Sequence, residues 1–260
     1  MVTQVAGCGL AYQVRGDGPP VLWIQGVGLH GDGWLPQIEP LHHRFRCIWC
    51  DNRGMGASQP MGPEPLTVER MAEDSLRVLD ATQTDAAHVV GHSLGGLVAL
   101  VMALRARQRV RSLSLLCSFA DGKAVAKPRA EMLWPAIRTR IGTRRMRRHA
   151  FLELVMPPRL LLSQDRDRLA EQLRPLFGHD LGDQPPIVDH QLKAMSQCDV
   201  TGRLHELQGL LVLVVSAEQD RIAPPRFGRR VADGIAGARY VELPSAGHGV
   251  VIHDAAVVND

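Results

Sequence analysis

A serine flanked by glycines constrains the fold of this chain more than any other feature. Residues 91–95 read GHSLG, a G-x-S-x-G pattern. The apolar, strand-like residues 88–90 precede this pattern, and an apolar, Ala-rich helical stretch at 94–106 follows it. A chain that turns so sharply from strand to helix needs small residues beside the serine, and the turn exposes the hydroxyl at the positive end of the helix. We therefore expect Ser93 to be a nucleophile.

Apolar strand-like runs alternate with helical patterns along the chain. From Thr67, a plausible N-cap, apolar residues recur at helical spacing. Between about residues 121 and 200 the strand-like runs disappear and Arg, Leu and Pro occur in helical stretches. The pattern predicts an α/β fold with a mostly parallel sheet and helices on both faces, comprising a core at 1–120 and 201–260 and an inserted helical cap at 121–200. Strands are expected at residues 10–14, 21–24, 46–50, 88–90, 113–117, 210–215 and 239–243.

A serine hydroxyl near neutral pH needs a general base, and the base needs a group to orient it. With this serine motif the usual order along the chain is serine, acid, histidine. Asp220 comes just after the buried strand 210–215, and His248 lies in a Gly-rich loop after the last strand. We expect His248 to be the base and Asp220 the orienting acid. Asp121, which follows an earlier strand, is the alternative acid.

Composition excludes several classes of function. The chain of 260 residues has a formal net charge of +3 and is 45% hydrophobic, which is typical of a soluble globular protein and gives no reason to expect nucleic acid as a partner. The basic stretch 144–148 (RRMRR) is interpreted as a solvated helix face, with attraction of an anionic substrate or surface as the alternative. No run approaches the roughly 20 apolar residues that span a bilayer. No secretory signal is visible at the N-terminus, so a cytoplasmic location is expected.

The five cysteines have no regular spacing and are odd in number, which argues against a disulfide framework. Cys47 and Cys50 form a C-x-x-C within a predicted strand. Residues three apart on a strand point to opposite faces, so the two thiols should not share a metal ion. We expect both to be buried apolar residues.

With these residues identified, the chain resembles the α/β-hydrolase superfamily over nearly its whole length. Four matches in the right order carry the resemblance. They are the loop 25–28 (QGVG), residues 51–58 (DNRGMGAS), which are similar to the family's D-x-R-G-x-G-x-S loop, the serine motif, and the pair Asp220 and His248. The resemblance implies an α/β-hydrolase fold with the site at the ends of the strands.

The resemblance also implies an oxyanion hole made by the backbone N–H groups of Val27 and Leu94. These donors would stabilise the negative charge on the attacked carbonyl oxygen. The chain departs from the family at Gln25, since a histidine usually stands at that position. The backbone donor survives this change, although the hydrogen bonds that support the loop should differ. After His248 the sequence leaves room for only a short final helix.

The expected reaction is hydrolysis of an ester, thioester or lactone of a small molecule through an acyl-enzyme on Ser93, with no metal and no organic cofactor. Serine as nucleophile argues against the dehalogenase and epoxide-hydrolase branches, which use aspartate. Small carboxylesterases, enol-lactonases and cofactor-free haloperoxidase-like hydrolases are most similar. A C–C bond hydrolase and a receptor without turnover are the alternatives. The sequence leaves the oligomeric state open. Candidate pocket residues, which at helical spacing are more often core, are Trp34, Met132, Leu133 and Trp134.

Overall fold

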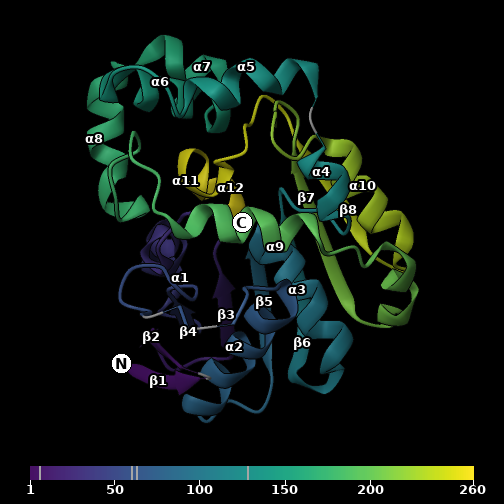
Figure 1. Ribbon diagram of the computed structural model, residues 1–260. Helices are drawn as coiled ribbons and strands as arrows, with labels where there is room; N and C mark the ends of the chain where they lie inside the picture. Colours follow the sequence, from purple (N-terminus) through teal and green to yellow (C-terminus); the bar gives the residue numbers. More distant parts are fainter. Residues whose placement is uncertain (6, 60, 63, 128) are drawn as a thin grey trace.

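The computed structural model describes residues 1–5, 7–59, 61–62, 64–127 and 129–260. Over these residues the centre of the molecule is an eight-stranded sheet in the order β1-β2-β4-β3-β5-β6-β7-β8 (Figure 1). Strand β2 pairs antiparallel with β1 and β4, and all other neighbours are parallel. The predicted α/β class with a mostly parallel sheet is therefore confirmed. The strands are β1 Val2–Val5, β2 Cys8–Arg15, β3 Pro20–Ile24, β4 Arg46–Cys50, β5 Ala87–His92, β6 Val110–Leu116, β7 Leu211–Ala217 and β8 Arg239–Leu243.

Both faces of the sheet are covered, which explains why β3 and β7 are almost wholly apolar. Helices α2, α3 and α10 contribute to the apolar core on one face, and α1 and α11 to the core on the other. Thr67 caps α2 as expected, because its hydroxyl oxygen accepts a hydrogen bond from the N–H of Arg70 at 3.1 Å. The flanking helices are α1 Leu35–Leu41, α2 Val68–Ala81, α3 Leu94–Arg105, α10 Pro225–Gly234, α11 Val250–His253 and α12 Ala255–Asn259. The described residues also form the 3-10 helices η1 Gly31–Trp34, η2 Arg107–Arg109 and η3 Thr201–Leu207.

The two cysteines of the C-x-x-C lie in different cores. Cys47 packs with Trp23 and Trp34 on one face of the sheet, and Cys50 belongs to the core on the other face. Both thiols are buried and free of disulfides. Burial raises the pKa of Cys50 to about 12. The pair therefore forms neither a disulfide nor a shared metal site, as the strand geometry predicted.

Residues 121–200, which we call the helical segment, connect β6 to β7. Helices α5 to α8 form a group beyond the end of the sheet, and α9 lies between that group and the sheet (Figure 1). The group has an apolar core of its own that includes Leu152, Leu173 and Phe177. None of the described helices is long and apolar enough to cross a membrane. The helices of the segment are α4 Gly122–Ala126, α5 Ala130–Arg138, α6 Arg144–Val155, α7 Pro158–Ser163, α8 Arg166–Phe177 and α9 Ile187–Ser196.

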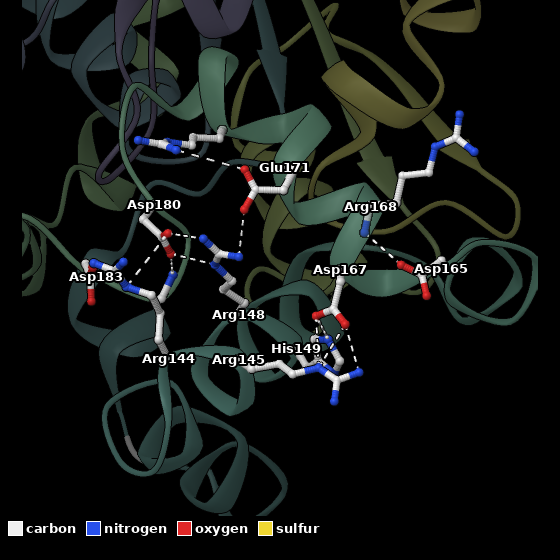
Figure 2. Close-up of polar contacts among 12 residues, drawn as sticks. Arg144, Arg145, Arg148, His149, Asp165, Asp167, Arg168, Glu171, Asp180 and Asp183 are labelled. Carbon is white, nitrogen blue, oxygen red and sulfur yellow. Dashed lines mark hydrogen bonds and ion pairs between the residues drawn. The ribbon is translucent and has the colours of Figure 1, made fainter.

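The basic stretch at the start of α6 is neutralised by carboxylates of the same segment. Figure 2 shows Arg148 between Asp180 and Glu171, with its Nε–H donating to Asp180 at 2.8 Å. The hydrogen bond from Arg148 lowers the pKa of Asp180 well below its usual value. The stretch therefore ties α6 to α8 and the following loop through ion pairs. The pairs are Arg144 with Asp183, Arg145 with Asp167, Arg147 with Asp183, and Arg148 with Asp180 and Glu171.

Candidate active site

Ser93 occupies the sharp turn between β5 and α3. Its φ of 53° and ψ of −119° lie in a region that L-residues rarely adopt. The end of β6 and the loop after it hold this conformation. The N–H of Ser93 donates to the carbonyl oxygen of Leu116 at 2.9 Å, and the hydroxyl of Ser118 donates to the carbonyl oxygen of Ser93 at 2.8 Å. The surrounding hydrogen bonds thus fix a strained backbone at the candidate nucleophile.

The glycines on either side of Ser93 are required by close backbone contacts. A Cβ atom on Gly91 would lie 2.4 Å from the carbonyl oxygen of Gly95. A Cβ atom on Gly95 would lie 2.1 Å from the carbonyl oxygen of Ile24 in β3. Any side chain at these positions would separate α3 from the sheet, and the serine turn could not form.

The structure brings Ser93, His248 and Asp220 together from three separate segments. His248 Nδ1–H donates to Asp220 Oδ2 at 2.7 Å, and Ser93 and His248 line the same cavity. The other oxygen, Asp220 Oδ1, accepts hydrogen bonds from the N–H groups of Ile222 and Ala223, both at 2.8 Å. Because Nδ1 of His248 carries the proton, its Nε2 presents the lone pair that a general base needs.

Asp220 is buried but remains ionised. Burial alone would raise its pKa, but the nearby His248 and the backbone N–H groups outweigh burial, so the pKa of Asp220 is lowered overall. A carboxylate with a lowered pKa can stabilise an imidazolium on His248 without taking its proton.

His92, which precedes the serine, is a site residue that the motif did not identify. Its Nε2–H donates to the backbone carbonyl oxygen of His248 at 2.9 Å, and the two ring centroids lie 4.9 Å apart. Burial, followed by the proximity of His248, lowers the pKa of His92 to about 3. His92 is therefore neutral and supports the loop that carries His248 without adding a charge.

The loop after β3 lies directly against the serine. A Cβ atom on Gly26 would be 3.2 Å from Ser93 Cβ, and Val27 lines the cavity. Gln25 supports this loop, since its Oε1 accepts a hydrogen bond from the Gly26 N–H at 3.0 Å and its carbonyl oxygen accepts one from Asn52 Nδ2 at 3.0 Å. The glutamine thus supplies a hydrogen bond to the loop from the position where relatives carry histidine.

The second expected donor, the N–H of Leu94, belongs to the first residue of α3. The first N–H groups of a helix have no acceptor within the helix. The N-terminus of α3 and the loop with Val27 flank Ser93, as two donors to one oxyanion would require.

The cavity beside Ser93 has a volume of about 250 Å³ and is mostly apolar. Both the sheet loops and the helical segment line it. Among its polar side chains, Gln184 has a buried Nε2 without a hydrogen-bond partner. Apolar side chains from both parts include Leu29, Phe119, Phe151, Leu154, Val188 and Met195.

The four pocket candidates named from the sequence lie outside the lining of this cavity. Trp34 is fully buried in the core, with its ring 5.1 Å from that of Trp23. Leu133 and Trp134 are 52% and 62% exposed, because α5 turns them away from the segment's core. Met132 packs against that core. The lining comes instead from other positions of α5, from α6, α8, α9 and α11, and from the loops around the serine.

Asp121, the alternative acid, has a local role. Its carboxylate accepts a hydrogen bond from the N–H of Ala124 at 2.8 Å and caps α4. Of the two candidate acids, Asp220 is the one that bonds to His248.

Within the described residues, ligand atoms of His92, Cys117 and His248 lie within 4.8 Å of one another. The ring nitrogens His92 Nε2 and His248 Nδ1 are already engaged by hydrogen bonds. Burial, together with the nearby Asp220, raises the pKa of Cys117 well above its usual value, which opposes the thiolate form that binds metals. One ring nitrogen of each histidine remains open, so it is the raised pKa of the Cys117 thiol that argues against a metal centre at this group.

Residues 19–255 match the family described as alpha/beta hydrolase fold. A relative from Azorhizobium caulinodans, named "Putative carbamate hydrolase RutD", is 32% identical over 92% of this chain and 88% of its own length. The enol-lactonase from Burkholderia xenovorans LB400 is similar in structure, with a TM-score of 0.81 and 25% identity over 100% of this chain and 96% of that one. A thermophilic esterase from Thermogutta terrifontis is also similar in structure, with a TM-score of 0.79 and 25% identity over 100% of this chain and 95% of that one.

Proposed function

The chain belongs to the α/β-hydrolase family, and we propose that it is a serine hydrolase that cleaves an ester, thioester or lactone of a small molecule. The observation that carries the proposal is the 2.7 Å hydrogen bond between His248 and Asp220 beside the cavity that Ser93 also lines. A strained serine, a histidine with a free Nε2 lone pair and a buried carboxylate are the parts that acyl transfer needs.

In the proposed mechanism, His248 Nε2 removes the hydroxyl proton of Ser93 as the oxygen attacks the substrate carbonyl carbon. Asp220 stabilises the imidazolium, which then protonates the leaving group. The acyl group remains on Ser93 as an ester. His248 next removes a proton from a water molecule, the water attacks the acyl carbon, and Ser93 recovers its proton as the carboxylic acid leaves.

The N–H groups of Val27 and Leu94 would donate to the oxyanion in both tetrahedral intermediates. In other serine hydrolases, loss of one such donor raises the activation free energy by roughly 3–4 kcal/mol. The N-terminus of α3 adds the favourable end of its dipole at the same place. The mechanism requires neither a metal nor an organic cofactor.

The lining of the cavity favours a substrate with an apolar acyl part. The cavity has a volume of about 250 Å³ and aromatic and aliphatic walls, so binding a hydrocarbon group there removes the most apolar surface from water. We propose that residues 121–200 are a cap whose helices α6, α8 and α9 form much of these walls and select the acyl group.

Carbamate hydrolysis is a second candidate, favoured by the names of the curated relatives. A carbamate carbonyl can react with the same three residues. An unsubstituted carbamate is small and polar, however, and would leave the apolar walls of the cavity unfilled.

The test is hydrolysis of p-nitrophenyl esters from acetate to octanoate, with a lactone and an N-alkyl carbamate alongside, by wild type and Ser93→Ala. We expect repeated turnover of esters by wild type, an optimum at intermediate chain length, and loss of at least about 10⁴-fold in Ser93→Ala. Preference for the carbamate would favour the second candidate. Release of one equivalent without turnover would favour a receptor, and turnover by Ser93→Ala would overturn the proposal.

A further inference from the structure

Two side chains of the helical segment hold both backbone polar groups of Gly28, the residue after Val27. The Gly28 N–H donates to Oε1 of Gln191 at 2.8 Å, across 163 positions of the chain. On the other side, Nε2 of His179 lies 2.8 Å from the Gly28 carbonyl oxygen, across 151 positions, and Nδ1 of the same ring lies 2.9 Å from the carbonyl oxygen of Asp180. A neutral imidazole carries one N–H, so the ring donates to Gly28 in its Nε2–H tautomer. The end of the loop that carries the expected oxyanion donor is therefore fixed by residues far away in sequence.

The contact with Gln191 is buried and close. Gln191 lies on α9 and is fully buried. Gly28 has a φ of +71°, and a Cβ atom there would lie 3.0 Å from a methyl group of Val188, also on α9. Helix α9 thus packs directly on a backbone conformation that only glycine adopts readily.

The contact with His179 is anchored in turn by charged groups. His179 is followed by Asp180, whose carboxylate accepts a hydrogen bond from Arg148 Nε at 2.8 Å and another from the Gly182 N–H at 2.8 Å. Figure 2 shows Asp180 and Arg148 in this network between α6 and the loop after α8. The loop that presents His179 is therefore tied to the body of the segment.

We infer that Gln191 and His179 are positioning residues for the oxyanion hole, an inference that rests on the proposed function. Each peptide group is planar, so holding the N–H and the carbonyl of Gly28 fixes the peptide planes on both sides of it. Asn52 holds the start of the same loop through the carbonyl oxygen of Gln25. The Gly26–Val27 peptide, which carries the Val27 N–H, lies between the anchored planes, so loss of an anchor would let the direction of this N–H change.

The helical segment therefore has two roles at one site. It lines the cavity that would take the acyl group, and it aligns a backbone group that acts when the oxyanion forms. Loss of either side-chain contact should weaken stabilisation of the transition state more than binding of the substrate.

The test uses the full chain with two loss variants and one conservative variant. Gln191→Met keeps a side chain of similar length without the acceptor, and His179→Phe keeps the ring without the donor. His179→Gln retains an N–H donor. With the best p-nitrophenyl ester we expect kcat to fall about 10-fold in each loss variant and further in the double variant, while KM changes less than about threefold. His179→Gln should retain most of kcat.

A second readout does not depend on the choice of substrate. A fluorophosphonate reacts with an activated serine and places an oxygen in the oxyanion hole, so its labelling rate at Ser93 should fall in parallel with kcat. Thr82→Val, which removes a buried hydroxyl at the end of α2 far from this loop, controls for a general loss of stability. Its kcat should not change.

The results separate the two proposals. Folded loss variants with kcat and labelling rates within twofold of wild type would overturn the inference and leave the proposed function intact. The inference would also be overturned if Thr82→Val lost as much kcat as the loss variants, or if the loss variants changed KM and left kcat unchanged. A wild-type protein that neither turns over esters nor reacts with the fluorophosphonate would overturn the proposed function and this inference with it.

Discussion

His92 donates a hydrogen bond from Nε2 to the backbone carbonyl oxygen of His248 at 2.9 Å, although 156 positions separate the two residues. The residue before the candidate nucleophile thereby supports the loop of the candidate base. The bond requires the proton on Nε2, and His92 Nδ1 is buried without a hydrogen-bond partner. Protonation of Nδ1 would place an unpaired charge in the core beside His248.

The first prediction concerns stability at acidic pH. Because the pKa of His92 is about 3 in the folded chain against 6.5 for an ordinary histidine, only the unfolded chain takes up this proton between these values. The free energy of unfolding should therefore fall with pH below about 6.5, by up to about 1.4 kcal/mol per pH unit from His92. Urea unfolding at pH 7, 6 and 5 should show that the free energy of unfolding falls less with pH in His92→Gln than in wild type. The exposed His190→Gln serves as control and should behave as wild type. Equal slopes in all three proteins would contradict the account of His92.

The second prediction separates the two candidate acids. Asp220→Asn should lower kcat by about 10⁴-fold, because an amide cannot stabilise the imidazolium of His248. Asp121→Asn should keep kcat within about threefold, since Asp121 caps α4 and asparagine is also a good N-cap. Ester hydrolysis by both variants provides the measurement. An active Asp220→Asn beside an inactive Asp121→Asn would reverse the assignment.

The third prediction concerns the loop at residues 51–58. Arg53, 1% exposed, donates from Nε to Asp74 of α2 at 2.8 Å, and Asp74 is also buried. Asp74→Asn would remove the carboxylate that accepts two hydrogen bonds from the buried guanidinium of Arg53, so we expect a loss of about 3–5 kcal/mol in the free energy of unfolding. The exposed Asp80→Asn, which breaks surface pairs, should cost less than about 1 kcal/mol. Urea unfolding of both variants tests this prediction. Similar losses in the free energy of unfolding would contradict the claim that the buried pair contributes more to stability than the surface pairs.

The fourth prediction tests the cavity as the acyl site. Leu192 on α9 lines the cavity and is 36% exposed, so Leu192→Trp should add volume at the cavity without disturbing the core. We expect kcat/KM for p-nitrophenyl octanoate to fall at least about 10-fold in Leu192→Trp. For p-nitrophenyl acetate, kcat/KM should change less than about threefold. Leu162→Trp, at an 86% exposed position outside the lining, should leave both unchanged. A uniform loss over all chain lengths would place the acyl group elsewhere.

Much of the fold could be predicted because its signals are local. The continuous apolar runs at residues 21–24 and 210–215 favour strands inside a sheet, and both lie in its parallel part. The serine motif predicts a sharp strand-to-helix turn, because the glycines around Ser93 permit the turn that the structure contains. Asp220 and His248 could be named because each follows a strand whose end lies at the same edge of the sheet.

The cavity lining and the supporting contacts could not be predicted in the same way. Trp34 lies in the core and Trp134 on the surface, and only the packing of helices decides which way each ring points. The hydrogen bond of Gln191 to Gly28 crosses 163 positions and involves a residue type common on any helix. His92 stood inside the recognised motif, yet no local pattern pairs it with the backbone of His248.

The central claim is that Ser93 becomes acylated during turnover. The most direct measurement is mass spectrometry of the protein quenched in acid within milliseconds of mixing with a p-nitrophenyl ester, followed by peptide mapping. The account predicts one acyl group on the peptide containing Ser93, gone after turnover ends and missing in Ser93→Ala and His248→Ala. An acyl group on another residue, or ester turnover with no acylated protein at any time, would contradict it.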